Sequence, residues 1–288
     1  MSLTSKLPIL RRDMQLFSLA STIFLRPRFR FNSQKSITVL GQLDSSPDLV
    51  VASVPSITSI QDLKGKTIMV DKAMSGYAYY PAQDPWSVVG GTRSRYQYLL
   101  NGKAPDGTPA CTTILTYPFT AEGLALPPGV GINALARASD FVNPFSSSAF
   151  TATTSVSNST EAALLTRFLT PMLEANQYLA DTKHKYCTIE AIATQLNISS
   201  SVAEAEYAAA TDPETGETAL MQEGVLNISR QSLLNAIDIR AQFGGFAGVP
   251  AGFEFAEAIV PGPSNLIDYT MRDQALKAVT DVKIKGSC

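Results

Sequence analysis

Short apolar runs separated by polar turns dominate the chain from residue 47 to residue 119, a pattern typical of strands alternating with short helices. Residues 59–64 predict a single helical turn that ends at Gly65. A short helix is expected over residues 93–100. Four runs rich in β-branched residues predict strands, at residues 49–54, 66–71, 87–89 and 111–115.

The second half of the chain has apolar residues at helical spacing instead. Asn158–Glu161 and Ser201–Glu204 have the spacing of a capping box, which predicts the start of a helix at each. Pro171 is expected to kink the first of these helices. Helices are predicted at residues 158–173, 188–196, 201–210, 229–243 and 265–282. The first half of the chain thus predicts strands that alternate with short helices, and the second half predicts mainly helices. This order indicates an α/β fold with a helical extension.

The first part of the chain differs in charge from the rest. Residues 1–43 carry seven basic residues and one acidic residue, a net charge of +6, whereas the remaining 245 residues carry 16 basic and 24 acidic residues. Residues 14–25 form an apolar run of signal-peptide length. A signal peptide has a cleavage site of small residues after this run, but here Arg26-Pro27-Arg28 follows. Three interpretations remain open: a targeting segment, for secretion or an organelle, a non-native leader on a cytoplasmic protein, or a segment with a role in the fold. Residues 1–42 are therefore left out of the fold argument.

Composition excludes several classes of function. The three cysteines form no CxxC pair and His184 is the only histidine, so we expect no metal site and no histidine-based catalytic device. Gly129 begins a GxGxxA sequence, but Pro127-Pro128 before it cannot belong to a central strand, so it is not a dinucleotide fingerprint. A net charge of −2 argues against nucleic acid as a partner, and no apolar run reaches membrane-spanning length. We therefore predict no catalytic residues, no cofactor and no membrane span.

Two glycine-containing turns follow predicted strands, and they are the candidate binding features. Ser75-Gly76-Tyr77 follows the strand at residues 66–71, and Gly91-Thr92 follows the strand at residues 87–89. Free N–H groups and the helix dipole at such positions favour an anion, and ligands of open α/β sheets bind at this edge. The alternative is ordinary turn chemistry.

Three N-x-[ST] sequons occur in the chain, and they are relevant only if it enters a secretory route. Their asparagines are Asn158, Asn197 and Asn227.

The strings IQDLKGKTIMVD (residues 60–71), SGY (75–77) and VGGTRSRY (89–96) resemble the ABC-transporter solute-binding proteins for nitrate, sulfonate and taurine. Relatives of that family include the fungal thiamine-pyrimidine synthases. LTYPFTAEGLA (115–125) is similar to a further family segment, and the resemblance covers about residues 44–260. It implies a periplasmic-binding-protein-like type II fold, with two α/β lobes and a ligand in the cleft. By this resemblance the cleft is lined by Ser75, Gly76, Tyr77, Gly91 and Thr92, with Pro118 and Phe119 as an apolar wall.

The chain departs from the family in two places. Family members carry one more strand and helix before the DLKGK strand, where this chain has only its basic leader. Thirteen residues separate Gly76 from Gly90, too few for the helix that the family has there. We therefore expect a truncated member: a leader (1–42), an α/β lobe with ligand-facing turns and missing pieces (43–155), and a helix-rich segment that returns to complete the other lobe (156–288).

The favoured hypothesis is a non-catalytic protein, degenerate or not, that binds a small anionic or aromatic molecule. A second hypothesis is an enzyme like the thiamine-pyrimidine synthases, which in that family use pyridoxal phosphate. Lys66 and Lys72 are then the candidates for a Schiff base, and His184 is the single histidine available. A third is an accessory protein of a biosynthetic pathway, without its own chemistry.

Overall fold

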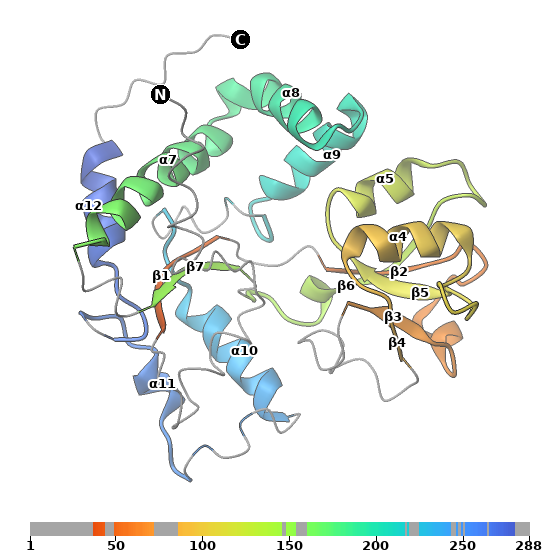
Figure 1. Ribbon diagram of the computed structural model, residues 1–288, viewed down its shortest axis with the longest axis horizontal. Helices are drawn as coiled ribbons and strands as arrows, with labels where there is room; N and C mark the ends of the chain where they lie inside the picture. The colour runs from red at the N-terminus through yellow and green to blue at the C-terminus, as the bar shows by residue number, and fades with distance from the viewer. Residues whose placement is uncertain are drawn as a thin grey trace. The chain divides into compact units, whose positions relative to one another are not determined.

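The computed structural model describes residues 37–43, 49–71, 86–145, 148–153, 160–216, 218, 225–242, 246, 249, 251–263 and 265–279 (Figure 1). The strands are β1 (Ile37–Gln42), β2 (Val50–Ser53), β3 (Ile68–Val70), β4 (Trp86–Val88), β5 (Thr112–Leu115), β6 (Asn133–Arg137) and β7 (Ala149–Thr153). The α-helices are α4 (Thr92–Asn101), α5 (Phe119–Ala125), α7 (Ala162–Ala180), α8 (Lys185–Leu196), α9 (Ser200–Ala210), α10 (Arg230–Gln242), α11 (Phe255–Ala258) and α12 (Thr270–Val279). Short 3-10 helices are η2 (Ile60–Leu63), η3 (Ala138–Asp140) and η4 (Thr182–His184).

The chain forms two compact units, and each is assembled from separate stretches of sequence. Unit 1 comprises residues 1–46, 144–184 and 211–288, and unit 2 comprises residues 47–143 and 185–210. The segments 43–155 and 156–288 therefore each contribute to both units. Strand β1 occupies the end of the range 1–42, which the sequence pattern predicts to be a leader. This six-residue strand pairs with β7 in unit 1.

A five-stranded sheet organises unit 2, with strand order β4-β3-β5-β2-β6. Strand β3 runs parallel to both β4 and β5, whereas β2 runs antiparallel to β5 and β6. Helix α4 packs on this sheet through buried Tyr96 and Leu99, which share a core with Met69 of β3 and Leu115 of β5. Burial on both faces explains why β3 and β5 are uninterrupted apolar or threonine-rich runs.

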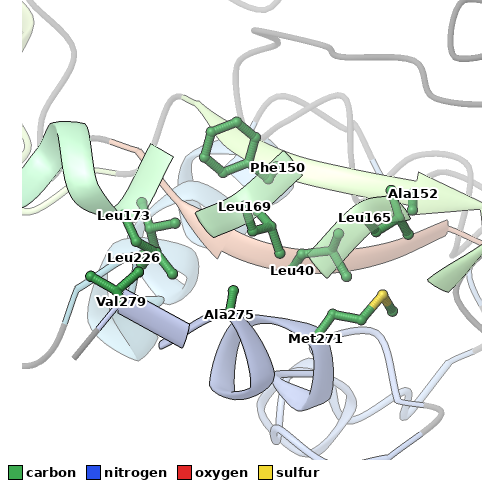
Figure 2. Packing of buried hydrophobic residues seen from close by; sticks show 10 residues of the cluster. All are labelled: Leu40, Phe150, Ala152, Leu165, Leu169, Leu173, Leu226, Met271, Ala275 and Val279. Carbon is green, nitrogen blue, oxygen red and sulfur yellow. The ribbon is translucent and has the colours of Figure 1, made fainter. Parts of the chain in front are cut away.

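Helix α7 and helix α12 cover the antiparallel β1–β7 pair of unit 1. Leu165, Leu169 and Leu173 recur every four residues on α7, so they line one face of that helix. Figure 2 shows Leu40 of β1 between Leu169 of α7 and the side chains of Met271 and Ala275 of α12, and all belong to one buried cluster. A second core of unit 1 gathers apolar side chains from α10, from the residues just before α10 and just after α11, and from the segment before α12, namely Ile228, Ile237, Ile259, Leu266 and Ile267, around Val39 and Ala149.

Several predicted elements are present with small shifts. The four predicted strands appear as β2 to β5, η2 is followed by Gly65 at φ 72°, and α4 ends at Gly102, which has a left-handed conformation. Helix α9 begins at Ser200 rather than Ser201, because the Ser199 hydroxyl accepts the Val202 N–H at 3.3 Å.

Other predictions require correction. Helix α7 begins at Ala162, after Glu161 as its N-cap, and Asn158 lies outside the described residues. Helix α12 begins at Thr270 rather than at residue 265, because Ile267 forms a parallel bridge with Val39, and residues 280–282 of the predicted range lie outside the described residues. Strands β1, β6 and β7 and helix α5 were not predicted, since their sequences show neither a clear alternation nor a helical stripe.

Candidate functional site

The carboxyl ends of three parallel strands meet at one edge of the unit 2 sheet (Figure 1). Asp71 follows β3, the Gly90-Gly91 turn follows β4, and Thr116 follows β5. Ligands of open α/β sheets bind at this kind of edge. We call residues 90–94 and 116–119, which lie there, the strand-end corner.

The start of α4 supplies unpaired backbone donors to the strand-end corner. Gly91 is the N-cap residue of this ten-residue helix and has no side chain to cap it, and the first intrahelical bond runs from the Arg95 N–H to the Gly91 carbonyl. The N–H groups of Thr92, Arg93 and Ser94 therefore have no acceptor among the described residues. The preceding Gly90 has a φ of 96°, which L-residues with side chains rarely adopt.

The buried Arg95 side chain holds the turn between β4 and α4 against the neighbouring strand β5. Its side chain is 2% exposed, and its guanidinium donates to the Gly90 carbonyl at 2.8 Å and to the Thr92 hydroxyl at 3.1 Å. It also donates to the Thr113 hydroxyl and the Ile114 carbonyl of β5, at 3.0 and 3.1 Å. One buried side chain thus ties the β4–α4 turn to the neighbouring strand.

The Thr92 hydroxyl is oriented by that contact. Because its oxygen accepts from Arg95, its own proton is directed elsewhere, and no acceptor for it lies among the described residues. Thr92 is half-buried, and its hydroxyl belongs to the first of the three residues whose N–H groups are free.

Pro118 and Phe119 form the other side of the strand-end corner. Pro118 is the N-cap of α5 and Phe119 is its first residue. The Phe119 ring centroid lies 5.4 Å from that of Tyr96, and the Arg93 guanidinium carbon lies 5.7 Å above the Phe119 ring. These contacts bring the starts of α4 and α5 together. Burial, and then the Glu122 carboxylate, raise the pKa of Tyr96, so this phenol is neutral at physiological pH.

A buried hydroxyl on α5 has no hydrogen-bond partner. The Thr120 side chain is fully buried, and its oxygen contacts no donor or acceptor in the described part of the chain. Most buried polar atoms are paired, so this hydroxyl is an unusual feature of the segment behind Phe119.

The structure brings together four of the seven predicted binding residues: Gly91, Thr92, Pro118 and Phe119. Ser75, Gly76 and Tyr77 lie outside the described residues, so their role stays a prediction. Sequence reasoning missed Arg93 and Arg95. The Thr92-x-x-Arg95 spacing, which allows contact across one helical turn, was the available signal.

Residues considered for other chemistry lie elsewhere. The His184 ring of unit 1 stacks on Tyr178 with centroids 4.0 Å apart, and its Nε2 lies 3.9 Å from an Asp181 carboxylate oxygen. Lys66 is exposed before β3, and Lys72 lies outside the described residues. Cys111, partly exposed, carries a free thiol.

Two kinds of feature are absent from the described residues. Within the described ranges, no helix combines the length and apolar character needed to cross a membrane. In the same part of the chain, no three His, Cys, Asp or Glu side chains gather as a metal site would require.

Solved structures show similarity to this chain, whereas no family model and no curated protein sequence matches it. The Candida albicans CA3427 gene product, which defines a family with the generic periplasmic binding protein fold, has 15% identity and a TM-score of 0.61 over 88% of this chain and 80% of its own. The alkanesulfonate-binding protein SsuA from Xanthomonas axonopodis pv. citri, bound to MOPS, has 12% identity and a TM-score of 0.57 over 81% and 82%. The nitrate-binding protein NrtA from Synechocystis has 11% identity and a TM-score of 0.57 over 91% and 73%.

These similarities define the class of fold: a mixed α/β, helix-rich chain of the periplasmic-binding-protein type. The resemblance to sulfonate and nitrate solute-binding proteins, predicted from the DLKGK and VGGT strings, is thereby confirmed. At these levels of identity the comparison establishes the fold alone.

Proposed function

We propose that the protein is a non-catalytic small-molecule-binding protein, and that it holds an anionic group of its ligand at the start of α4. The observation that carries this proposal is the set of unpaired N–H groups of residues 92–94 at the carboxyl edge of the parallel strands. The positive end of a helix dipole and free N–H groups stabilise a negative charge.

The chemistry of the neighbouring structures supports an oxyanion. One is an alkanesulfonate-binding protein with bound MOPS and another binds nitrate, so both accept singly charged oxyanions. In this chain, the Thr92 hydroxyl and the N–H groups beside it are donors of the kind that such oxygens accept. The Arg93 side chain is exposed on the same helical turn and adds a positive charge.

Nearby acidic groups favour a single negative charge on the ligand. The Asp71 carboxylate follows β3 at this edge, and Glu122 lies in the first turn of α5. A carboxylate near an anion disfavours it, and the cost grows with the charge of the anion. We therefore favour a monoanion, with an apolar or aromatic part toward Phe119, over a doubly charged ligand.

Titration calorimetry of the full chain tests this function. Ethanesulfonate, MOPS and nitrate serve as monoanion probes, sulfate as the doubly charged probe and cytosine as an uncharged aromatic probe. We expect saturable heat for at least one monoanion and weaker binding of sulfate. A sample that unfolds cooperatively and yet gives no heat with any probe contradicts the proposal.

A further inference from the structure

The α8–α9 turn of unit 2 presents a sequon on the protein surface. Asn197 directly follows the last residue of α8, is exposed and has a φ of 55°. The Ile198 N–H donates to the Ala193 carbonyl at 3.1 Å, which is the six-residue bond of a Schellman motif. This bond holds the backbone of Asn197 in a left-handed conformation, which asparagine tolerates better than most residues.

The side chains of this sequon are accessible. No hydrogen bond to the Asn197 amide comes from any residue in the described ranges. Ser199 is exposed, and its hydroxyl accepts the Val202 N–H at the start of α9. The Asn197 amide nitrogen is therefore free to react while the turn around it keeps its structure.

The sequon at Asn227, in unit 1, has the opposite setting. The Asn227 side-chain oxygen accepts from Arg272 at 3.2 Å, and the guanidinium carbon of Arg272 lies 3.6 Å from the Tyr269 ring centroid. Ser229 is buried, its hydroxyl accepts the Ser232 N–H at the start of α10, and its own N–H donates to Gln42. Asn227 is only partly exposed and Ser229 is buried, so this sequon is less accessible in the fold than the one at Asn197.

We infer that Asn197 is an acceptor for an N-linked glycan on chains that enter the lumen of the endoplasmic reticulum, and that Asn227 is not. In the transfer, the Asn197 Nδ2 forms a bond to C1 of the first sugar and loses one proton. The bond from C1 to the pyrophosphate oxygen of a lipid-linked oligosaccharide breaks, and the lipid pyrophosphate leaves. This inference is independent of the proposed ligand.

The test uses the full chain behind a cleavable secretion signal in a eukaryotic cell. All variants carry N158Q, because Asn158 lies outside the described residues. Peptide N-glycosidase removes the glycan and converts the modified asparagine to aspartate, which peptide mass spectrometry locates. We expect one glycan on the N158Q parent, none on N197D and an unchanged glycan on N227D. Aspartate also tolerates a left-handed backbone, so N197D keeps the turn.

Two matched variants separate the sequon from the turn. S199T keeps both the hydroxyl cap of α9 and the sequon, and we expect it to keep the glycan. S199A destroys the sequon while leaving Asn197, and we expect no glycan. If a variant is not exported, the protein retained inside the cell is digested with peptide N-glycosidase in the same way, and mass spectrometry again locates the glycan. A glycan that persists in N197D, a glycan lost in N227D, or a translocated parent without a glycan overturns the inference.

Discussion

At the residue scale, Arg95 is the side chain on which the strand-end corner depends most. Its spacing from Thr92 was the one local signal, and pattern analysis missed its role because an arginine in a short helix with mixed polarity is expected to face solvent. Only the pairing of β3 with both neighbours brings Thr113 and Ile114 beneath α4, where they accept from the guanidinium. The candidate turn itself was predictable, since Gly-Gly-Thr after a β-branched run carries its own local signal.

Replacement of Arg95 by methionine should destabilise unit 2. R95M keeps most of the apolar stem but leaves the Gly90 and Ile114 carbonyls without this donor. We expect the free energy of unfolding to fall by about 2–4 kcal/mol, measured by urea denaturation with circular dichroism. The control is R93M on the same helix, whose side chain is exposed over Phe119 and whose loss should cost no more than about 1 kcal/mol. Equal losses in the two variants would show that the buried network contributes nothing.

At the element scale, helices were easier to predict than strands. The leucine stripe of α7 and the capping serines before α9 act locally, so the sequence reveals them. Strands β1 and β7 pair with each other, although more than 100 residues of chain lie between them. Pairing of this kind leaves little trace in the sequence of either strand.

The buried face of α7 gives a direct test of the unit 1 core. Leu169 is fully buried in the core that also contains residues of β1 and α12, whereas Leu164 on the same helix is 44% exposed. We expect L169A to lower the free energy of unfolding by about 3 kcal/mol, since a cavity replaces the side chain. L164A should change it by no more than about 0.5 kcal/mol. Urea denaturation measures both changes. A larger loss of unfolding free energy in L164A than in L169A would contradict the packing shown in Figure 2.

The 3-10 helix η2 should carry a pH-dependent contribution to stability. The Ser59 hydroxyl, followed by the Thr58 N–H, holds the pKa of Asp62 below its ordinary value of 3.8. A carboxyl whose pKa is lower in the folded state stabilises the fold above the unfolded-state pKa, and this contribution is lost as the pH falls through the folded-state pKa.

Thermal unfolding of D62N at pH 6 and pH 3 tests that contribution. We expect a lower melting temperature than wild type at pH 6 and a smaller difference at pH 3, where a larger fraction of the wild-type carboxyl is protonated than at pH 6. E190Q, which changes an exposed carboxylate on α8, is the control. The same deficit for D62N at both pH values would argue against a role for the ionised carboxylate.

At the scale of the whole molecule, the class of fold was predictable although the division of the chain was not. The DLKGK and VGGT strings led to the periplasmic-binding-protein fold because they encode one strand and one turn of unit 2. The passage of α8 and α9 into unit 2, and the contribution of residues 37–42 to unit 1, depend on contacts between distant segments. Such contacts emerge only from the complete fold.

The central claim is that the free N–H groups at the start of α4 bind an anion, and nuclear magnetic resonance tests it most directly. In a titration with ethanesulfonate, the amide resonances of Thr92, Arg93 and Ser94 should shift along one saturable curve. Those of Asn101 and Gly102, at the opposite end of the same helix, should stay in place. Saturable binding that leaves residues 92–94 unshifted would contradict the account.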